Sequence, residues 1–181
     1  MTKDHKYNSN LDFKMMNLFF KIRDFFKDPR KKIEKIHLKR GDYVLEYGCG
    51  PGSFTVAIAE RIGPKGKVYA ADIHPLAPEK VIKKAEKNEL ENIETIITDC
   101  KTELEKNSID KVILIDILHD LENYEENLKE FYRILKNDGK LWVDDHHFEG
   151  KQIKFRINKN GLFEYISKKD SLYEFRKNFK S

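Results

Sequence analysis

Residues 46–52 read Glu46-Tyr47-Gly48-Cys49-Gly50-Pro51-Gly52, and this stretch decides the fold of the chain. The β-rich run Tyr43–Tyr47 leads directly into the glycines, which predicts a short strand followed by a tight loop. Ser53 is suited to cap a helix with apolar residues at helical spacing up to Ile62. Gly63-Pro64-Lys65-Gly66 then ends this helix. The sequence therefore predicts a strand, a glycine loop and a helix N-terminus, an arrangement that can hold a ligand.

The spacing of the glycines separates the ligands that such a loop can hold. A phosphate-binding P-loop needs Gly-x4-Gly-Lys-Ser/Thr, which the sequence lacks. A dinucleotide loop would place its third glycine at position 53, which is Ser53, whereas the third glycine here is Gly52. The order is instead Glu46-x-Gly48-x-Gly50-x-Gly52, with a carboxylate near the end of the strand. The remaining alternative is that the glycines only make a tight turn between strand and helix.

Strand and helix patterns alternate outward from this unit. Predicted strands at 68–71 and 94–98 end at Asp72 and Asp99, and the continuous apolar strand at 112–115 ends at Asp116. The other predicted elements are helices at 76–88, 124–135 and 152–160, a strand at 140–144 after the turn Asn137-Asp138-Gly139, and an antiparallel hairpin at 163–167 and 172–175. The order predicts an α/β, Rossmann-like doubly wound, mostly parallel seven-stranded sheet with a C-terminal hairpin.

The N-terminal region is predicted to be helical. Apolar residues at spacings of three and four indicate a helix over 11–27, and a second short helix follows Asp28-Pro29 up to about Leu38. Phe19, Phe20, Phe25 and Phe26 either pack against the core or form a lid over a ligand. The prediction is one domain over 1–181, with N-terminal helices and candidate lid at 1–40, a ligand-binding core at 41–147, and a closing helix and hairpin at 148–181.

The glycine stretch resembles motif I of the class I S-adenosylmethionine-dependent methyltransferases, whose pattern is acidic-x-Gly-x-Gly-x-Gly. Asp72, Asp99 and Asp116 follow at the ends of the second, third and fourth predicted strands, as in that family. Residues 131–141 resemble the family's helix, turn and entry into the fifth strand. The resemblance covers about residues 35–147. Within the family, the chain is similar above all to the small ubiquinone-biosynthesis-type methyltransferases. The resemblance implies S-adenosylmethionine as methyl donor.

The resemblance also implies residue roles at the donor site. Asp72 would accept hydrogen bonds from both ribose hydroxyls, and Asp99 would lie near the adenine amino group. The donor is a sulfonium cation with an ammonium group, so the Glu46 carboxylate favours it over NAD, whose pyrophosphate it would repel. The donor-binding residues implied in this way are Glu46, Gly48, Gly50, Gly52, Asp72, Ile73, Asp99, Cys100 and Asp116.

Two clusters of acids and histidines are predicted to meet at the carboxyl edge of the sheet. The first is Asp116-Ile117-Leu118-His119-Asp120, which lacks the Asn/Asp-Pro-Pro-Tyr/Phe signature of methyltransferases acting on adenine or glutamine amino groups. The second is Asp144-Asp145-His146-His147. Because successive strand residues alternate faces, not all four residues of the second cluster can point into one site.

Three interpretations of the histidines stay open: bases that deprotonate the acceptor, ligands of a metal ion, or solvated side chains without a catalytic role. We assign His119 and His147 as candidate catalytic residues, His119 first and with Asp120 or Asp144 as the partner of its ring, and assign no metal.

Composition limits the partners. The chain has 181 residues and a net charge of +4, and only 7 of its 35 basic residues are Arg, so it is not suited to recognising nucleic acid by bidentate contacts. The sequence shows no signal peptide and no apolar run long enough to span a membrane, which predicts a cytoplasmic protein. Cys49 and Cys100 are expected to be free thiols.

The prediction is methyl transfer to a small molecule, with the acceptor and the oligomeric state left open. The alternatives are an RNA or protein methyltransferase, or a donor-binding or partner subunit without catalysis.

Overall fold

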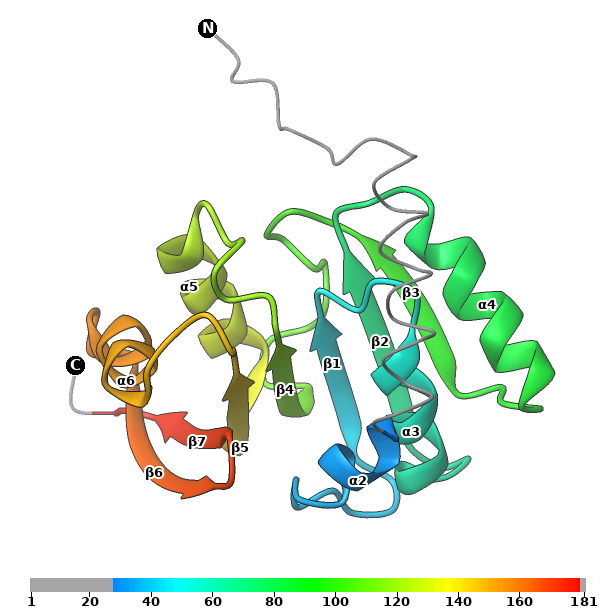
Figure 1. Ribbon diagram of the computed structural model, residues 1–181, viewed down its shortest axis with the longest axis horizontal. Coiled ribbons are helices and arrows are strands. Elements are labelled where there is room, and N and C mark those ends of the chain that lie inside the picture. Colours follow the sequence, from blue (N-terminus) through cyan, green and yellow to red (C-terminus); the bar gives the residue numbers. More distant parts are fainter. Residues whose placement is uncertain (1–27, 180–181) are drawn as a thin grey trace, which may run out of the picture.

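The computed structural model describes residues 28–179. Within this range lies one seven-stranded sheet, in the order β3-β2-β1-β4-β5-β7-β6, with helices packed against it (Figure 1). The first five strands are parallel, and β7 pairs antiparallel with both β5 and β6. The elements are α2 (Pro29–Ile33), β1 (Tyr43–Tyr47), α3 (Ser53–Ile62), β2 (Lys67–Asp72), α4 (Ala77–Lys87), β3 (Ile93–Ile97), β4 (Ile109–Ile115), α5 (Tyr124–Ile134), β5 (Leu135–Asp144), α6 (Gly150–Asn158), β6 (Phe163–Lys169) and β7 (Leu172–Lys177). The predicted fold class is confirmed.

Alternate residues of the central strands face different layers of helices. Val44 and Ile113 pack with residues of α2 and α3, whereas Leu45 and Val112 pack with residues of α5 and α6. All four side chains are fully buried. Burial on both faces explains why these strands read as continuous apolar runs without alternation. The polar groups of the site are therefore confined to the strand ends and the loops that follow them.

The predicted turn Asn137-Asp138-Gly139 lies inside β5, which begins at Leu135 and not at Lys140. In the pairing with β4, residues 136–139 of β5 oppose only Asp110. These turn-forming residues thus form an extended bulge in β5, and the strand pairs with β4 again after them. The helix α5 ends at Ile134, close to the predicted end at residue 135. The predicted reason for this end, a turn at Asn137-Asp138-Gly139, was wrong.

The second predicted helix is shorter than expected. The helix α2 ends at Ile33, and the chain reaches Leu38 through turns. Ile33, Ile36 and Leu38 are all buried in the same apolar cluster. Irregular turns are needed here because a regular helix would rotate Leu38 away from the face that carries Ile33.

Several sequence predictions lie outside the described residues. These are the helix over 11–27 and the candidate lid formed by Phe19, Phe20, Phe25 and Phe26. Within residues 28–179, no helix has both the length and the apolar character that crossing a membrane requires.

Candidate active site

The loop after β1 has a backbone that depends on its glycines. Gly48, Gly50 and Gly52 have φ angles of 79°, 51° and 77°, a region that residues with a side chain rarely adopt. A Cβ on Gly48 would also lie 2.4 Å from Cγ1 of Ile117, in the loop after β4. The two loops therefore touch at Gly48, which leaves no room for a larger residue.

The helix behind the loop starts differently from the prediction. Gly52, and not Ser53, occupies the N-cap position of α3, in a left-handed conformation and without a side-chain cap. Ser53 is the first helical residue, and its hydroxyl accepts a hydrogen bond from Lys84 Nζ at 3.2 Å. The first turn of α3 thus keeps backbone N–H groups free of a capping side chain, as a ligand-binding N-terminus requires.

The loop carries a negative potential. Glu46 is only 3% exposed in β1, and the hydroxyl of Thr55 in α3 donates to its carboxylate. Burial raises the pKa of the Cys49 thiol well above its usual value, and the Glu46 and Asp72 carboxylates raise it further. Burial disfavours a charge of either sign, but the two carboxylates favour a cation over an anion at this position. Cys49 and Cys100 are both free thiols, as predicted.

Asp72 ties the end of β2 to the glycine loop. Its carboxylate accepts the N–H of Gly50 at 2.7 Å and the N–H of His74 at 2.8 Å. Burial raises the pKa of Asp72, and these two hydrogen bonds offset part of the effect. Ile73, the next residue, is 40% exposed and offers an apolar surface beside the carboxylate. The contact between Asp72 and Gly50 is not visible in the sequence, because the two residues lie 22 positions apart.

Asp99 and Cys100 follow β3 at the same edge. Asp99 is exposed and Cys100 is half-buried, and the Cys100 N–H donates to the Thr98 hydroxyl at 3.1 Å. Burial raises the pKa of Tyr47 in β1, and the ionised forms of Cys100, Asp99 and Asp72 raise it further. The ends of β1, β2 and β3 therefore bring these groups within electrostatic reach of one another.

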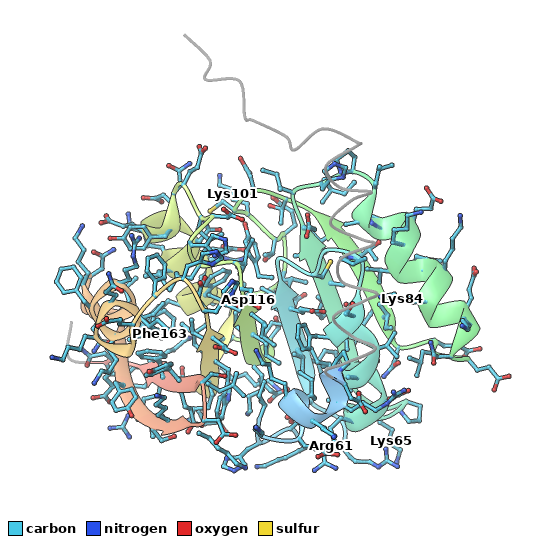
Figure 2. The ribbon with its side chains drawn as sticks, in the orientation of Figure 1. Arg61, Lys65, Lys84, Lys101, Asp116 and Phe163 are labelled. Atoms are coloured by element: carbon cyan, nitrogen blue, oxygen red, sulfur yellow. The ribbon has the colours of Figure 1, made fainter. Side chains whose placement is uncertain are left out.

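Asp116 begins the loop after β4 in a strained conformation. Its φ angle is 54°, and its N–H donates to the Asp144 carbonyl at 2.8 Å. Its carboxylate accepts the N–H of His146 at 3.3 Å and lies 2.8 Å from Nδ1 of the same residue. Figure 2 labels Asp116 close to the end of β4. The residue joins the β4 and β5 loops and stands between the glycine loop and the histidines.

A single buried carboxylate holds two imidazoles. Oδ2 of Asp145 accepts the N–H of His119 at 3.0 Å and lies 2.9 Å from its ring Nδ1. Oδ1 accepts the N–H of His147 at 2.9 Å and lies 3.3 Å from its Nδ1. The Asp145 side chain is 0% exposed. Burial alone would raise the pKa of Asp145, but the hydrogen bonds from His119 and His147 bring it below its usual value.

The three neighbouring imidazoles lie close together. The ring centroids of His119 and His147 are 3.7 Å apart, and those of His146 and His147 are 4.0 Å apart. The exposed fraction of the side chain rises from 23% in His119 to 48% in His147 and 69% in His146. His119 is thus the best sheltered of the three, with its Nδ1 held by a carboxylate and its Nε2 on the other side of the ring. A neutral imidazole held in this way can accept a proton on Nε2.

Of the two acids predicted as partners of the His119 ring, Asp120 does contact it, whereas Asp144 does not and was wrong. Asp144 faces the other side of the sheet, where it contacts Lys32 and Ser171. The Asp120 carboxylate lies 3.4 Å from Nε2 of His119 and contacts the opposite side of the ring. The sequence listed Asp145 in the second cluster without a role, because strand alternation does not tell which of two adjacent acids faces the site. The expectation that the cluster divides between two faces is met.

The same residues could also surround a cation. Among the described residues, one ligating atom from each of His119, Asp145 and His147 lies within 4.8 Å of the others, and the same holds for Asp116, Asp145 and His146. Imidazole and carboxylate are ligands that divalent transition metals accept. Both groups share Asp145, whose two oxygens are already engaged by backbone N–H groups.

Comparisons with known proteins agree with this geometry. A family model described as a methyltransferase domain matches residues 38–178. A demethylmenaquinone methyltransferase of Geobacillus sp. (strain WCH70) is 28% identical over 127 residues, 70% of this chain and 54% of that protein. An (S)-coclaurine N-methyltransferase of Thalictrum flavum subsp. glaucum is 26% identical over 61% of this chain and 30% of its own length. The chain thus spans about half or less of these curated relatives.

Solved structures share the whole fold. A SAM-dependent methyltransferase from Aquifex aeolicus superposes with a TM-score of 0.74 at 23% identity, covering 82% of this chain and 89% of that one. A putative S-adenosyl-L-methionine-dependent methyltransferase from Methanococcus maripaludis superposes with a TM-score of 0.78 at 16% identity, covering 100% and 98%. Since the family model covers residues 38–178, and thus every strand of the sheet, the chain belongs to the methyltransferase domain family.

Proposed function

We propose that this protein transfers a methyl group from S-adenosylmethionine to a small-molecule acceptor. The observation that carries the proposal is the hydrogen bond from the Gly50 N–H to Asp72, which holds a half-buried carboxylate directly against the glycine loop. The residues present fit this donor, because the first turn of α3 has no capping side chain and the Glu46 and Asp72 carboxylates act on the loop at Cys49. A pyrophosphate would meet repulsion from Glu46 at the same position.

The donor-binding roles follow the order of the strand ends. The Asp72 carboxylate would accept the ribose hydroxyls with the lone pairs that Gly50 and His74 leave free. Glu46 and the glycines Gly48, Gly50 and Gly52 would surround the cationic methionine end. Ile73, Asp99 and Cys100 would line the adenine, and Asp116 would border the reacting methyl group.

The acceptor side would need a base. Methyl transfer is an in-line displacement, so a hydroxyl or carbon acid must lose a proton as its bond to the methyl carbon forms, and the donor leaves as a neutral thioether. His119 would take that proton on Nε2, with Asp145 fixing the tautomer at Nδ1 and stabilising the cation that forms. His147 shares the same carboxylate and is the second candidate.

The acceptor class is supported by the relatives and by the sequence. The names of the relatives include demethylmenaquinone and coclaurine, both small molecules. The loop after β4 reads Asp116 to Asp120 and lacks the signature of enzymes that methylate adenine or glutamine amino groups. An RNA or protein methyltransferase and a donor-binding subunit without catalysis are the competing functions.

Calorimetry tests the donor first. S-adenosylmethionine and S-adenosylhomocysteine should bind, and NAD should not. Asp72→Ala should weaken donor binding by about 1.5–3 kcal/mol, the range for hydrogen bonds to a charged group. Asp138→Ala, an exposed acid in the β5 bulge, is the matched control. Binding of NAD alone, or an unchanged donor affinity in Asp72→Ala, would contradict the proposed site.

Incubation with isotopically labelled donor tests the acceptor. Label should appear in small metabolites of an extract and not in RNA or protein. Label confined to RNA or protein would favour the first competing function. Donor binding without any labelled product from a broad acceptor screen would favour the donor-binding subunit.

A further inference from the structure

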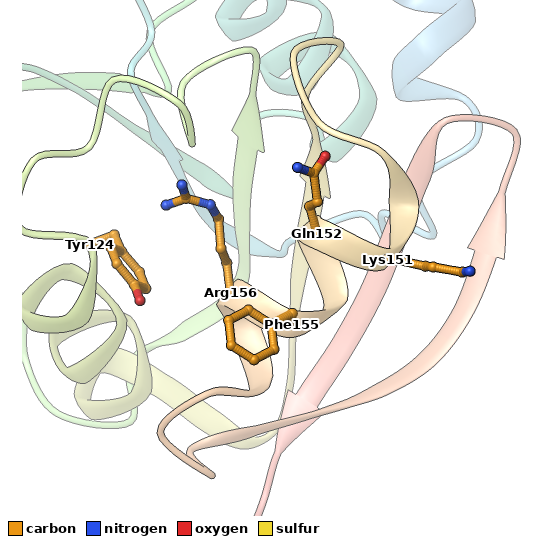
Figure 3. A pocket seen from close by; sticks show the side chains of 5 residues that line it. All are labelled: Tyr124, Lys151, Gln152, Phe155 and Arg156. Carbon is orange, nitrogen blue, oxygen red and sulfur yellow. The ribbon is translucent and has the colours of Figure 1, made fainter.

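A hollow of about 580 Å³ lies between the start of α5 and the exposed side of α6. Its lining consists of Tyr124, Lys151, Gln152, Phe155 and Arg156. Figure 3 shows Tyr124, Gln152, Phe155 and Arg156 around the hollow, with Lys151 extending away from Tyr124 and Arg156. The walls thus combine two aromatic rings with one guanidinium, one amide and the exposed ammonium side chain of Lys151.

The guanidinium of Arg156 is held by aromatic rings. Its central carbon lies 4.4 Å from the ring centroid of Phe148 and 5.4 Å from that of Tyr124. Within residues 28–179 the structure records no hydrogen bond or ion pair of Arg156 with a carboxylate, and the nearby Glu125 is paired with Lys159 at 2.8 Å. Stacking fixes the plane of the guanidinium and leaves its N–H groups available for an anion.

The other lining residues complete a site for a ligand with an apolar body. Phe155 is 67% exposed although it is a large apolar side chain. Gln152 accepts the N–H of Glu149 on Oε1 at 2.8 Å, which orients the amide and leaves its nitrogen free to donate. Two aromatic rings beside a cation held by ring contacts, a lysine and an amide donor have the composition of a small-molecule pocket.

The hollow is joined to the candidate catalytic loops. Phe148, which stacks on Arg156, follows His147 directly in the chain. Tyr124 begins α5 at the end of the loop that carries His119. A ligand anchored at Arg156 therefore sits against residues that belong to the same two loops as the proposed bases.

We propose that this hollow anchors a methyl acceptor that carries a carboxylate or phosphate on an aromatic or other apolar body. The anionic group binds the guanidinium of Arg156 and the amide of Gln152, and the apolar body lies against Tyr124 and Phe155. This inference rests on the proposed function for the identity of the ligand as an acceptor, but the binding chemistry of the hollow can be measured separately.

The test uses the full chain saturated with S-adenosylhomocysteine and three probes: 2-naphthoate, 2-naphthyl phosphate and the uncharged 2-naphthamide. Binding is followed by NMR titration. At least one anionic probe should bind ten times or more tightly than the amide, because hydrogen bonds to a charged group are worth that much. The stronger of the two anions identifies the group that the hollow prefers. Equal binding of all three probes would overturn the proposal.

Two variants assign the preference to the hollow. Arg156→Gln should abolish the preference for the anions, whereas Arg61→Gln should keep it, because Arg61 is exposed and lies far from the carboxyl ends of the parallel strands (Figure 2). A preference that survives in Arg156→Gln, with circular dichroism showing a folded variant, would overturn the proposal. Calorimetry with S-adenosylhomocysteine on the same samples should be unchanged in both variants. Failure of the wild type to bind that ligand would instead contradict the proposed function, whatever the probes show.

Discussion

Asp145 is the residue on which the acceptor side depends. One of its carboxylate oxygens contacts the backbone N–H and ring of His119, and the other contacts the backbone N–H and ring of His147. The side chain is fully buried. A carboxylate in this position fixes which ring nitrogen carries the proton. The base function would therefore be a property of the pair formed by Asp145 and His119.

Replacement of His119 by Ala should lower turnover about 10²–10⁴-fold and leave donor affinity nearly unchanged, because a base acts only on the acceptor proton. His147→Ala should have the smaller effect. His37→Ala, an exposed histidine away from the strand ends, is the control, and turnover is measured with labelled donor once an acceptor is known.

Full turnover in both variants would show that catalysis is by positioning alone. Loss of activity on chelation, restored by one divalent metal, would instead favour the cation interpretation of the same residues.

The sequence named candidate site residues but not their partners. Glu46, Asp72 and the glycines were named from a motif whose resemblance to the methyltransferase family implies their roles. The contact of Asp72 with Gly50 and the choice of Asp145 over Asp144 depend on how separate strands are aligned, which a single sequence does not encode locally. The stacked Arg156 also escaped prediction, because its aromatic partners lie on two different loops.

At the level of elements, the β1 and β4 loops approach each other closely beside the proposed donor site. Gly48→Ala should lower the free energy of unfolding by at least about 2 kcal/mol, from left-handed strain and overpacking against Ile117 together. The double variant Gly48→Ala with Ile117→Ala should recover the packing part only. Urea unfolding measures both, and equal stability of Gly48→Ala and wild type would contradict the described contact.

The helix α5 is tied to the β3–β4 connection by an acid. Glu130 accepts from Arg133 at 2.8 Å and from the Thr102 N–H at 3.0 Å. Burial opposes its charge, but the hydrogen bonds from Arg133 and Thr102 outweigh burial and lower its pKa to about 2. A depressed pKa in the folded state means that Glu130 stabilises the fold above its unfolded pKa and loses this contribution as pH falls toward 2.

Urea unfolding of the wild type and Glu130→Gln at several pH values measures this contribution. The stability advantage of the wild type should be full at pH 6 and should shrink steadily from about pH 4.5. A difference between the two proteins that does not change between pH 6 and pH 3 would show that Glu130 acts by packing and not by charge.

Element boundaries were predicted well where the local signal and the packing agree. The strand β1 and the first residues of the two hairpin strands are such cases, whereas β4 begins at Ile109 and not at Val112. The bulge in β5 was missed because Asn137-Asp138-Gly139 has the composition of a chain turn, and only the pairing with β4 shows that the strand continues past it. The short α2 was overextended because the buried residues Ile33 and Ile36 also fit a helical period.

At the level of the whole molecule, one apolar cluster links the strand β1 to the C-terminal hairpin. A single apolar cluster contains Leu45 of β1, Phe131 of α5, and Phe163 and Phe175 of the hairpin. The chain should therefore unfold as a unit. The only tryptophan, Trp142, is 1% exposed in β5, so its fluorescence reports on the sheet while far-ultraviolet circular dichroism reports on all elements.

The two signals should give the same urea midpoint within error. Separate midpoints would mean that residues 148–181 form a unit of their own and that the single-domain prediction is wrong.

The strand order gives the last strand an interior place. β7 lies between β5 and β6 although it follows both in the chain. During synthesis, β6 leaves the ribosome before β7, the strand that connects β6 to the rest of the sheet. The outer edge of β5 therefore stays unpaired in the nascent chain until Leu172–Lys177 has emerged and can pair with it. A chain stopped before this point would present an open apolar edge, which makes it a substrate for chaperones and a source of aggregation.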